Sequence, residues 1–251
     1  MLYILNADDF GRTATANQAI TECFQKGTVT NTSIMVTMPF YEEAKRLAKD
    51  NGFWDKVGLH INLTSGIPLT EEIKQCRAFT NENGFFNSAI FKKKRITLVL
   101  TLKEKKAVKK EIEAQIQRYI LDGFTLMHAD SHGHIHAFPS LKKIVFACLK
   151  RYGFKSVRIS RNIHEKNGLK KLYKKISNKQ FQKLGYSTDY FGSIADALRM
   201  EENEKQGVCE IMTHPNYFDG VFGYGEPIEE SVIIKNFPNK ISFLDCHRGE
   251  R

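Results

Sequence analysis

Leu2-Tyr3-Ile4-Leu5-Asn6-Ala7-Asp8-Asp9-Phe10-Gly11 begins as an apolar run and changes abruptly to acidic and turn-forming residues. This pattern is typical of a buried strand that is followed by a loop. From residue 13 to residue 26 apolar side chains recur at helical spacing, and Gly27 is a typical helix stop. A buried strand followed by a helix is the repeating unit of α/β proteins, so this opening predicts a parallel sheet with crossover helices.

The same alternation continues through the chain. Further strands are predicted at residues 32–38, 56–61, 124–127, 156–159, 187–191 and 207–213, with a last edge strand at 241–244. Helices are predicted at residues 41–49, 102–121, 141–152 and 194–206. With about seven or eight strand–helix units, we expect an irregular (β/α) TIM-like barrel of parallel strands, formed as a single domain by residues 1–251.

Two segments interrupt this alternation. Residues 62–94 form a long polar connection that contains Gly66, Pro68 and Gly84. A connection of this length within a compact domain is usually functional, so we expect a lid or a substrate loop. Residues 162–185 form a lysine-rich insertion that is predicted to be a helical excursion, the alternative being a polar surface insertion.

The composition indicates a soluble, globular protein, with 41% hydrophobic and 26% charged residues. No apolar run approaches the roughly 18 residues of a membrane span, so no membrane partner is expected. Residues 1–6 lack the basic and long apolar regions of a signal peptide, which predicts a cytoplasmic location. The five scattered cysteines contain no C-x-x-C pair and therefore exclude a disulfide framework and a cysteine zinc site.

The formal net charge of +10 requires an explanation, because a basic surface can bind nucleic acid. Many of the lysines alternate with glutamates at helical spacing, and no nucleic-acid-binding motif accompanies them. We therefore expect a solvated basic face and no nucleic-acid partner.

Residues 128–136, His-Ala-Asp-Ser-His-Gly-His-Ile-His, hold four of the chain's eight histidines and one aspartate, all at even positions. In an extended segment these side chains would project from one face. Imidazole and carboxylate are preferred ligands of zinc and related divalent cations. The alternative is a solvated histidine-rich loop. Since the stretch is internal, it is not a terminal tag, and it predicts a metal or catalytic site.

Other polar residues stand at the ends of predicted strands. Asp8 and Asp9 follow the first strand, His60 ends an apolar strand, and His214 precedes Pro215 after the strand at 207–213. Active sites of parallel barrels are built at the carboxyl ends of their strands, so these residues are expected to converge with the histidine cluster. The alternatives are a helix cap for the aspartates, a satisfied core residue for His60 and a turn support for His214. His164 and His247 lack such a setting and are expected at the surface.

Several catalytic signatures are absent from the sequence: the G-x-S-x-G elbow, the H-E-x-x-H helix, the P-loop and the dinucleotide-binding G-x-G-x-x-G. Covalent serine catalysis, nucleotide-driven transfer and dinucleotide redox chemistry therefore lose support. Metal-assisted hydrolysis remains, either of an amide or of a phosphoester. A protein that binds carbohydrate or nucleic acid on the same scaffold without turnover is the alternative from another class.

Four motifs occur together and in order: N-A-D-D-F-G at 6–11, G-L-H-I-N-L-T at 58–64, the histidine stretch at 128–136 and T-H-P at 213–215. In these motifs the chain resembles the YdjC-like carbohydrate deacetylases. The resemblance implies an irregular (β/α) barrel that removes N-acetyl groups from amino sugars such as chitooligosaccharides. It also implies a divalent cation, magnesium first and zinc as the alternative.

The resemblance further implies roles for individual residues. Asp9, His60 and His132 correspond to the metal ligands. Asp8 corresponds to the catalytic base, with Asp9 beside it, and His214 to the catalytic acid. The remaining members of the histidine stretch would orient ligands or bind sugar hydroxyls, namely Asp130, His134 and His136. The expected partner is a small acetylated sugar; the oligomeric state is left open, with a homodimer as the candidate assembly.

Overall fold

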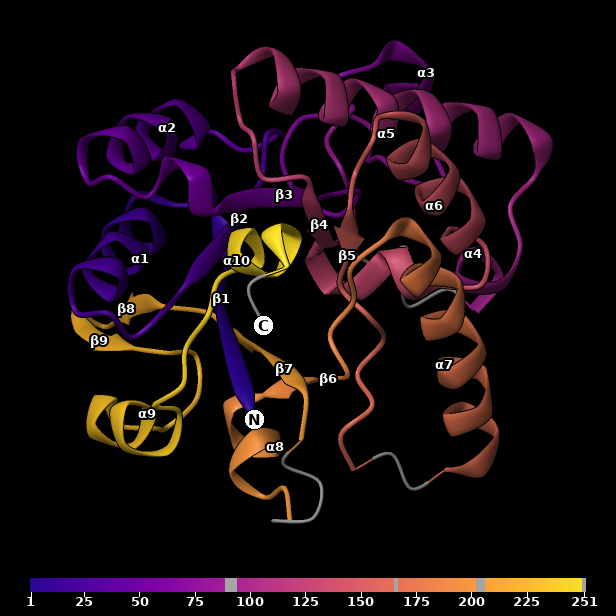
Figure 1. The fold of residues 1–251 in the computed structure, drawn as a ribbon. Helices are drawn as coiled ribbons and strands as arrows, with labels where there is room; N and C mark the ends of the chain where they lie inside the picture. Colours follow the sequence, from indigo (N-terminus) through magenta and orange to yellow (C-terminus); the bar gives the residue numbers. More distant parts are fainter. Residues whose placement is uncertain (89–93, 165–166, 202–205, 250–251) are drawn as a thin grey trace.

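The computed structural model of this chain describes residues 1–88, 94–164, 167–201 and 206–249 (Figure 1). Its centre is a seven-stranded parallel sheet with the strand order β5-β4-β3-β2-β1-β7-β6. The sheet curls, and helices cover its outer side. The predicted irregular α/β barrel is confirmed. The strands are β1 (Leu2–Phe10), β2 (Asn31–Ile34), β3 (Val57–Ile61), β4 (His128–Ser131), β5 (Ser156–Val157), β6 (Tyr190–Ser193) and β7 (Val208–Thr213).

The connections contain helices whose ends are capped by local side chains. Thr13 caps α1 by accepting a hydrogen bond from the Ala16 amide, and Thr101 and Glu104 form a capping box at the start of α5. The α-helices are α1 (Ala14–Gln25), α2 (Tyr41–Asp50), α3 (Glu71–Lys74), α4 (Lys94–Leu98), α5 (Leu102–Leu121), α6 (Lys142–Arg151), α7 (Gly168–Phe181), α8 (Ile194–Leu198), α9 (Glu230–Asn236) and α10 (Phe243–Arg248). Short 3-10 helices are η1 (Trp54–Lys56), η3 (His132–Ala137) and η4 (Gln182–Leu184), and a small antiparallel hairpin pairs β8 (Asn216–Phe218) with β9 (Val221–Gly223).

The chain that follows the edge strand β5 is linked to the other edge strand, β6, through Asn162. The Asn162 amide N–H donates to the Phe191 carbonyl at 3.2 Å, and the Phe191 N–H donates to Asn162 Oδ1 at 2.9 Å. Asn162 Nδ2 also donates to the Asp189 carbonyl. The backbone N–H and the side-chain amide of Asn162 thus supply hydrogen bonds that a neighbouring strand would otherwise supply at this edge, which makes the barrel irregular at this position.

Three sequence predictions about strands are wrong. β1 continues to Phe10, so Asp8 and Asp9 belong to a strand and not to a loop. The strand predicted at 124–127 lies instead at His128–Ser131, where Leu59 pairs with Ala129 and His60 with Asp130. The predicted edge strand at 241–244 is also wrong, because only Lys240 bridges to β1 and a capping box of Ser242 and Asp245 then begins α10.

The remaining elements agree with the predicted pattern, although several are shorter. The helix at 102–121 has the predicted bounds, whereas the helix predicted at 194–206 ends at Leu198, and residues 202–205 fall outside the described part of the chain. The lysine-rich insertion is helical as predicted and forms α7 and η4. All five cysteines are buried thiols that take part in no disulfide.

The first part of the long connection after β3 is fixed to α5. The buried carboxylate of Glu111 accepts hydrogen bonds from the Leu69 and Thr70 amides and from the Thr70 hydroxyl. Asn62 Oδ1 accepts from the Thr64 and Ser65 amides and closes a tight turn. Hydrogen bonds therefore hold both ends of the segment 62–70 in place. A role of this connection in covering a substrate stays a prediction, and residues 89–93 of it lie outside the described residues.

Among the described residues, none of the helices combines the length and the apolar composition that crossing a bilayer requires.

Candidate active site and metal centre

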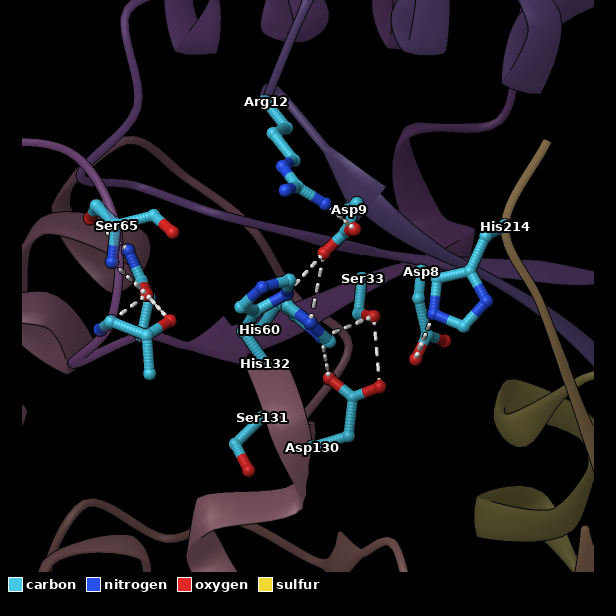
Figure 2. Close-up of polar contacts among 12 residues, drawn as sticks. Asp8, Asp9, Arg12, Ser33, His60, Ser65, Asp130, Ser131, His132 and His214 are labelled. Carbon is cyan, nitrogen blue, oxygen red and sulfur yellow. Dashed lines mark hydrogen bonds and ion pairs between the residues drawn. The ribbon is translucent and has the colours of Figure 1, made fainter. Parts of the chain in front are cut away.

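The polar residues at the carboxyl ends of the strands meet in one place (Figure 2). Asp8 and Asp9 come from β1, His60 from β3 and Asp130 from β4, while His132 starts η3 directly after β4. Figure 2 shows the side chains of Asp9, His60 and His132 turned toward one another. The predicted convergence occurs because parallel strands present their carboxyl ends at the same edge.

The backbone of Asp9 separates the two neighbouring aspartates. The register between β1 and β2 shifts between Ala7 and Phe10, and Asp9 has a φ of 71°. A positive φ is uncommon outside glycine, although aspartate tolerates it better than most residues, and a strand irregularity of this kind re-aims a side chain. As a result, Asp9 faces His132 while Asp8 faces the buried guanidinium of Arg158.

Asp9, His60 and His132 form a compact three-residue cluster. His132 Nδ1 donates to Asp9 Oδ1 at 2.7 Å, and His60 Nε2 lies 3.4 Å from the same oxygen. The ligand atoms of the three residues all lie within 4.8 Å of one another. Burial alone would raise the pKa of Asp9, but the hydrogen bonds from His132 and His60 outweigh it and hold this pKa well below its usual range.

The chemistry of these donors fits a divalent cation. One carboxylate and two imidazoles are a common ligand set for zinc and other transition metals, whereas magnesium favours oxygen ligands. His60 Nδ1 donates to Asp130 Oδ1 at 2.6 Å, which leaves Nε2 directed at the cluster. A carboxylate behind a histidine ligand is the usual arrangement for fixing its tautomer and orientation. Although burial opposes the charged form, Asp130 and Asp9 raise the pKa of His60 to about 10.

Asp8 is held by a fully buried arginine. Arg158 Nη1 donates to Asp8 Oδ2 at 2.6 Å and Nη2 to Oδ1 at 2.7 Å. The same guanidinium lies 2.9 Å from Asp130 and donates through Nε to Glu210 at 2.6 Å. Burial would raise the pKa of Asp8, but Arg158 reverses this and holds it well below the usual range. For Glu210, burial raises the pKa by more than the nearby Arg158 lowers it, so this pKa rises to about 7.

His214 lies at the rim of this site. Its side chain is 46% exposed, and Nε2 lies 3.9 Å from Asp8 Oδ2. A cavity of about 420 Å³ opens beside these two residues, a volume within the usual range for small-molecule sites. Its lining consists of Asp8, Asp9, Arg12, Thr13, Ala16, His214, Pro215, Asn216, Phe218 and Gly225. A separate cavity of about 430 Å³ is lined mainly by residues of α7, four of them lysines, and contains none of the predicted site residues.

The histidine stretch does not form one face, so that prediction is wrong. The strand ends at Ser131, and positive φ angles at Gly133 and His134 turn the chain into η3. His128 points elsewhere, with Nδ1 2.8 Å from Ser156 Oγ and its ring stacked on Phe243.

Two further histidines of the stretch, His134 and His136, have contacts with residues outside the cluster. His136 Nδ1 is 2.5 Å from Ser131 Oγ, and the His134 ring contacts the edge of Phe191 at 5.5 Å between centroids. Their predicted contacts with a sugar stay predictions. His164 is exposed as expected, whereas His247 is half-buried, with Nε2 2.8 Å from Ser156 Oγ, so its predicted surface position is wrong.

The sequence prediction missed Arg158, Glu210 and Arg12. Arg12 donates to Asp9 Oδ2 at 2.7 Å and so occupies the oxygen that faces away from the histidines. Arg158 and Glu210 stand in the apolar runs Ser-Val-Arg-Ile at 156–159 and Val-Cys-Glu-Ile at 208–211. An ionisable residue within an otherwise apolar strand was the signal that singled out His60. The same signal identifies Arg158 and Glu210.

Known proteins match almost the whole chain. The family model described as YdjC-like protein matches residues 2–237. A relative from Vibrio cholerae serotype O1, named carbohydrate deacetylase, is 32% identical over 98% of this chain and 92% of its own length. A relative from Geobacillus stearothermophilus with the same name is 34% identical over 92% of this chain and 88% of its own length.

A solved structure shares the fold. It is a protein from Enterococcus faecalis V583 described provisionally as a cellobiose-phosphate cleavage protein, with a TM-score of 0.69 and 24% identity over 92% of this chain and 89% of its own. The motif-based resemblance is confirmed by the family match and by the two relatives. This chain belongs to the YdjC-like family.

Proposed function

We propose that this chain is a metal-dependent carbohydrate deacetylase that hydrolyses the N-acetyl groups of acetylated amino sugars such as chitooligosaccharides. An enzyme that deacetylates carbohydrates is supported by the names of its relatives at 32% and 34% identity. The observation that carries the finer proposal is the Asp9–His60–His132 cluster directly beside Asp8 and His214. Asp8, Asp9 and His214 line one cavity, and residues that can hold a cation, a carboxylate and an imidazole are the components that amide hydrolysis requires.

Asp9, His60 and His132 are the residues that would hold the cation. When bound, it would polarise the acetyl carbonyl and lower the pKa of the attacking water. Because His60 Nδ1 donates to Asp130, Nε2 is the atom that would bind the cation, once it gives up the proton that it shares with Asp9. Magnesium, favoured by the family resemblance, and zinc, favoured by the two imidazoles, are the cations to compare.

Asp8 and His214 would move the protons. Arg158 keeps Asp8 ionised and directs its Oδ2 toward His214, so this carboxylate accepts the proton of the water that attacks the acetyl carbon. His214 donates a proton to the amide nitrogen as the carbon–nitrogen bond breaks. The products are acetate and a free amino sugar. His214 suits this role because it lies at the solvent-exposed rim and can exchange protons with water.

The test is an acetate-release assay coupled to metal analysis. Wild type is expected to release acetate from acetylated chitobiose and longer oligomers, and to lose this activity after chelation and regain it with a divalent cation. His60→Ala and His132→Ala should lose both the bound metal and the activity, whereas His164→Ala, an exposed histidine outside the cluster, should retain both.

Robust activity of either cluster variant without bound metal would overturn the proposal. Release of phosphate from phosphorylated sugars, with no acetate from any acetamido sugar, would identify a phosphoesterase instead. The predicted cytoplasmic location and a homodimeric assembly remain parts of the proposal, to be checked by cell fractionation and by light scattering.

A further inference from the structure

Four residues of the segment after β7 line the site cavity, namely His214, Pro215, Asn216 and Phe218. His214, Asn216 and Phe218 alternate along the chain, and all three contribute to the cavity wall. Successive side chains of an extended segment point to opposite sides, so the intervening Tyr217 points away. The candidate acid, a side-chain amide and an aromatic ring are therefore presented in a row to whatever occupies the cavity.

Phe218 is an exposed aromatic residue in this row. It is 49% exposed, although it belongs to a strand in a well-formed hairpin. Aromatic side chains commonly line cavities that bind small molecules, and the Phe218 ring lies on the wall of such a cavity. The ring offers an apolar surface to a ligand at small cost in side-chain entropy.

Gly223 on β9 provides the space for this ring. A Cβ atom at Gly223 would lie 3.3 Å from Phe218 Cδ2 and 3.5 Å from Cε2. Gly223 is absent from the positive-φ glycines, so its backbone does not need a glycine. The missing side chain instead lets the Phe218 ring lie across the hairpin.

Contacts with α1 fix the opposite side of the hairpin. The Tyr217 hydroxyl donates to Glu22 at 2.5 Å, and Lys26 Nζ lies 5.0 Å from the centre of the Phe222 ring. The His214 amide donates to the Tyr224 carbonyl, which joins the hairpin to the candidate acid. These contacts fix the position of the hairpin, so Phe218 has a defined position relative to His214.

We propose that Phe218 is a stacking platform for a pyranose ring and that Asn216 beside it binds a polar group of the same sugar. This inference rests on the proposed deacetylase function and adds the residues that recognise the substrate. One face of a pyranose carries mainly C–H groups, which pack against an aromatic ring and are removed from water there. An amide next to the ring can then bind a hydroxyl or acetamido group.

The platform also reaches beyond the site cavity. Phe218 lines a second depression of about 290 Å³ together with Gly223, Gly225, Glu226 and Pro227. A sugar unit joined to the acetylated unit can continue into this depression across the Phe218 ring. The platform therefore favours an oligosaccharide over a monosaccharide.

The test compares Phe218→Ala, Phe218→Leu and Phe218→Trp with wild type on acetylated chitobiose and on N-acetylglucosamine. Loss of the aromatic face in the Ala and Leu variants is expected to raise KM for the disaccharide about tenfold, with kcat changed less than about twofold. Phe218→Trp retains an aromatic face and should keep the wild-type KM. Gly223→Val should raise KM like Phe218→Ala, because its side chain displaces the ring. Phe40→Ala removes a phenylalanine that is 40% exposed and lies outside the cavity lining, and it should leave KM and kcat unchanged.

Sugar binding is also measured without turnover, through the fluorescence of Phe218→Trp, with wild type as the control for Trp54. If wild type releases no acetate but chitobiose changes the fluorescence of Phe218→Trp alone, the deacetylase function fails and the platform stands. If wild type is active while Phe218→Ala and Phe218→Leu keep the wild-type KM, the platform is overturned and the function stands. Equal thermal unfolding of the variants excludes misfolding as the cause of a raised KM.

Discussion

The guanidinium of Arg158 binds Asp8 through two parallel hydrogen bonds, from Nη1 to Oδ2 at 2.6 Å and from Nη2 to Oδ1 at 2.7 Å. Both residues are almost completely removed from water, and Arg158 also contacts Asp130 and Glu210. A buried cation among three carboxylates is tolerated only when its hydrogen bonds are made. Arg158 therefore fixes the side chain proposed as base and also joins it to the carboxylate that orients His60.

Replacing Arg158 should disturb stability and activity together. Arg158→Met leaves buried carboxylates without their cation and is expected to lower the free energy of unfolding by about 3–5 kcal/mol. Arg158→Lys keeps the charge but loses the two-pronged geometry, so it should fold better yet lose roughly 100-fold in kcat. Urea unfolding and acetate release measure the two effects. Arg161→Met is the control: it removes a half-exposed ion pair with Asp196 and should lower the free energy of unfolding by less than about 1 kcal/mol. Equal losses of stability at both arginines would contradict the role assigned to Arg158.

Asp130→Asn tests the carboxylate behind His60. The substitution keeps the shape of the side chain but no longer holds a full negative charge 2.6 Å from His60 Nδ1. Metal affinity is expected to fall roughly 10- to 100-fold, the usual cost of losing such a partner. Competition with a chromophoric chelator measures it. Asp50→Asn, in an exposed pair with Arg46, is the control and should keep the wild-type affinity.

The pH dependence of stability should report on His247. Burial, with a contribution from Lys155, lowers the pKa of His247 to about 4 from an ordinary value of 6.5. Below pH 6.5 the unfolded chain therefore binds a proton that the folded chain does not bind until the pH nears 4. The contribution of His247 to the free energy of unfolding is then full above pH 6.5 and is lost as the pH falls toward 4.

His247→Gln keeps a hydrogen-bonding group for Ser156 but does not titrate. Urea unfolding between pH 7.5 and pH 4 should show a smaller loss of stability for this variant than for wild type. His164→Gln, at an exposed histidine, should follow wild type. Identical pH profiles for His247→Gln and wild type would show that His247 does not titrate differently on folding.

Glu111 should be important for the position of the connection after β3. Glu111→Ala leaves the Leu69 and Thr70 amides without their acceptor and should lower the free energy of unfolding by about 1–3 kcal/mol per unsatisfied group. Glu111→Gln retains one acceptor oxygen and should cost less. Hydrogen exchange at residues 69 and 70 measures the local effect. Glu113→Ala, which removes an ion pair with Arg151, should leave that exchange unchanged.

Much of the molecule could be predicted because the deciding information is local. The bounds of α5 were predicted to the residue, since an apolar stripe and a capping group act over a few positions. The convergence of Asp9, His60 and His132 was predicted because parallel strands bring their carboxyl ends together, whereas their selection as a set came from the resemblance to the YdjC-like deacetylases. By itself, the sequence determined the α/β alternation, the family and the convergence of Asp9, His60 and His132 at the ends of the strands.

Tertiary structure alone decided the features that depend on distant partners. β4 lies at His128–Ser131 because its hydrogen bonds are made with β3, about 70 residues earlier, and not because of its own apolar content. Arg158 meets Asp8 across 150 residues of chain, and Phe218 obtains its place from the missing side chain of Gly223. Strand pairing, buried charge compensation and ring packing are satisfied only between segments far apart in sequence. No local pattern specifies which segments these are, because their contact depends on the folded arrangement of the whole sheet.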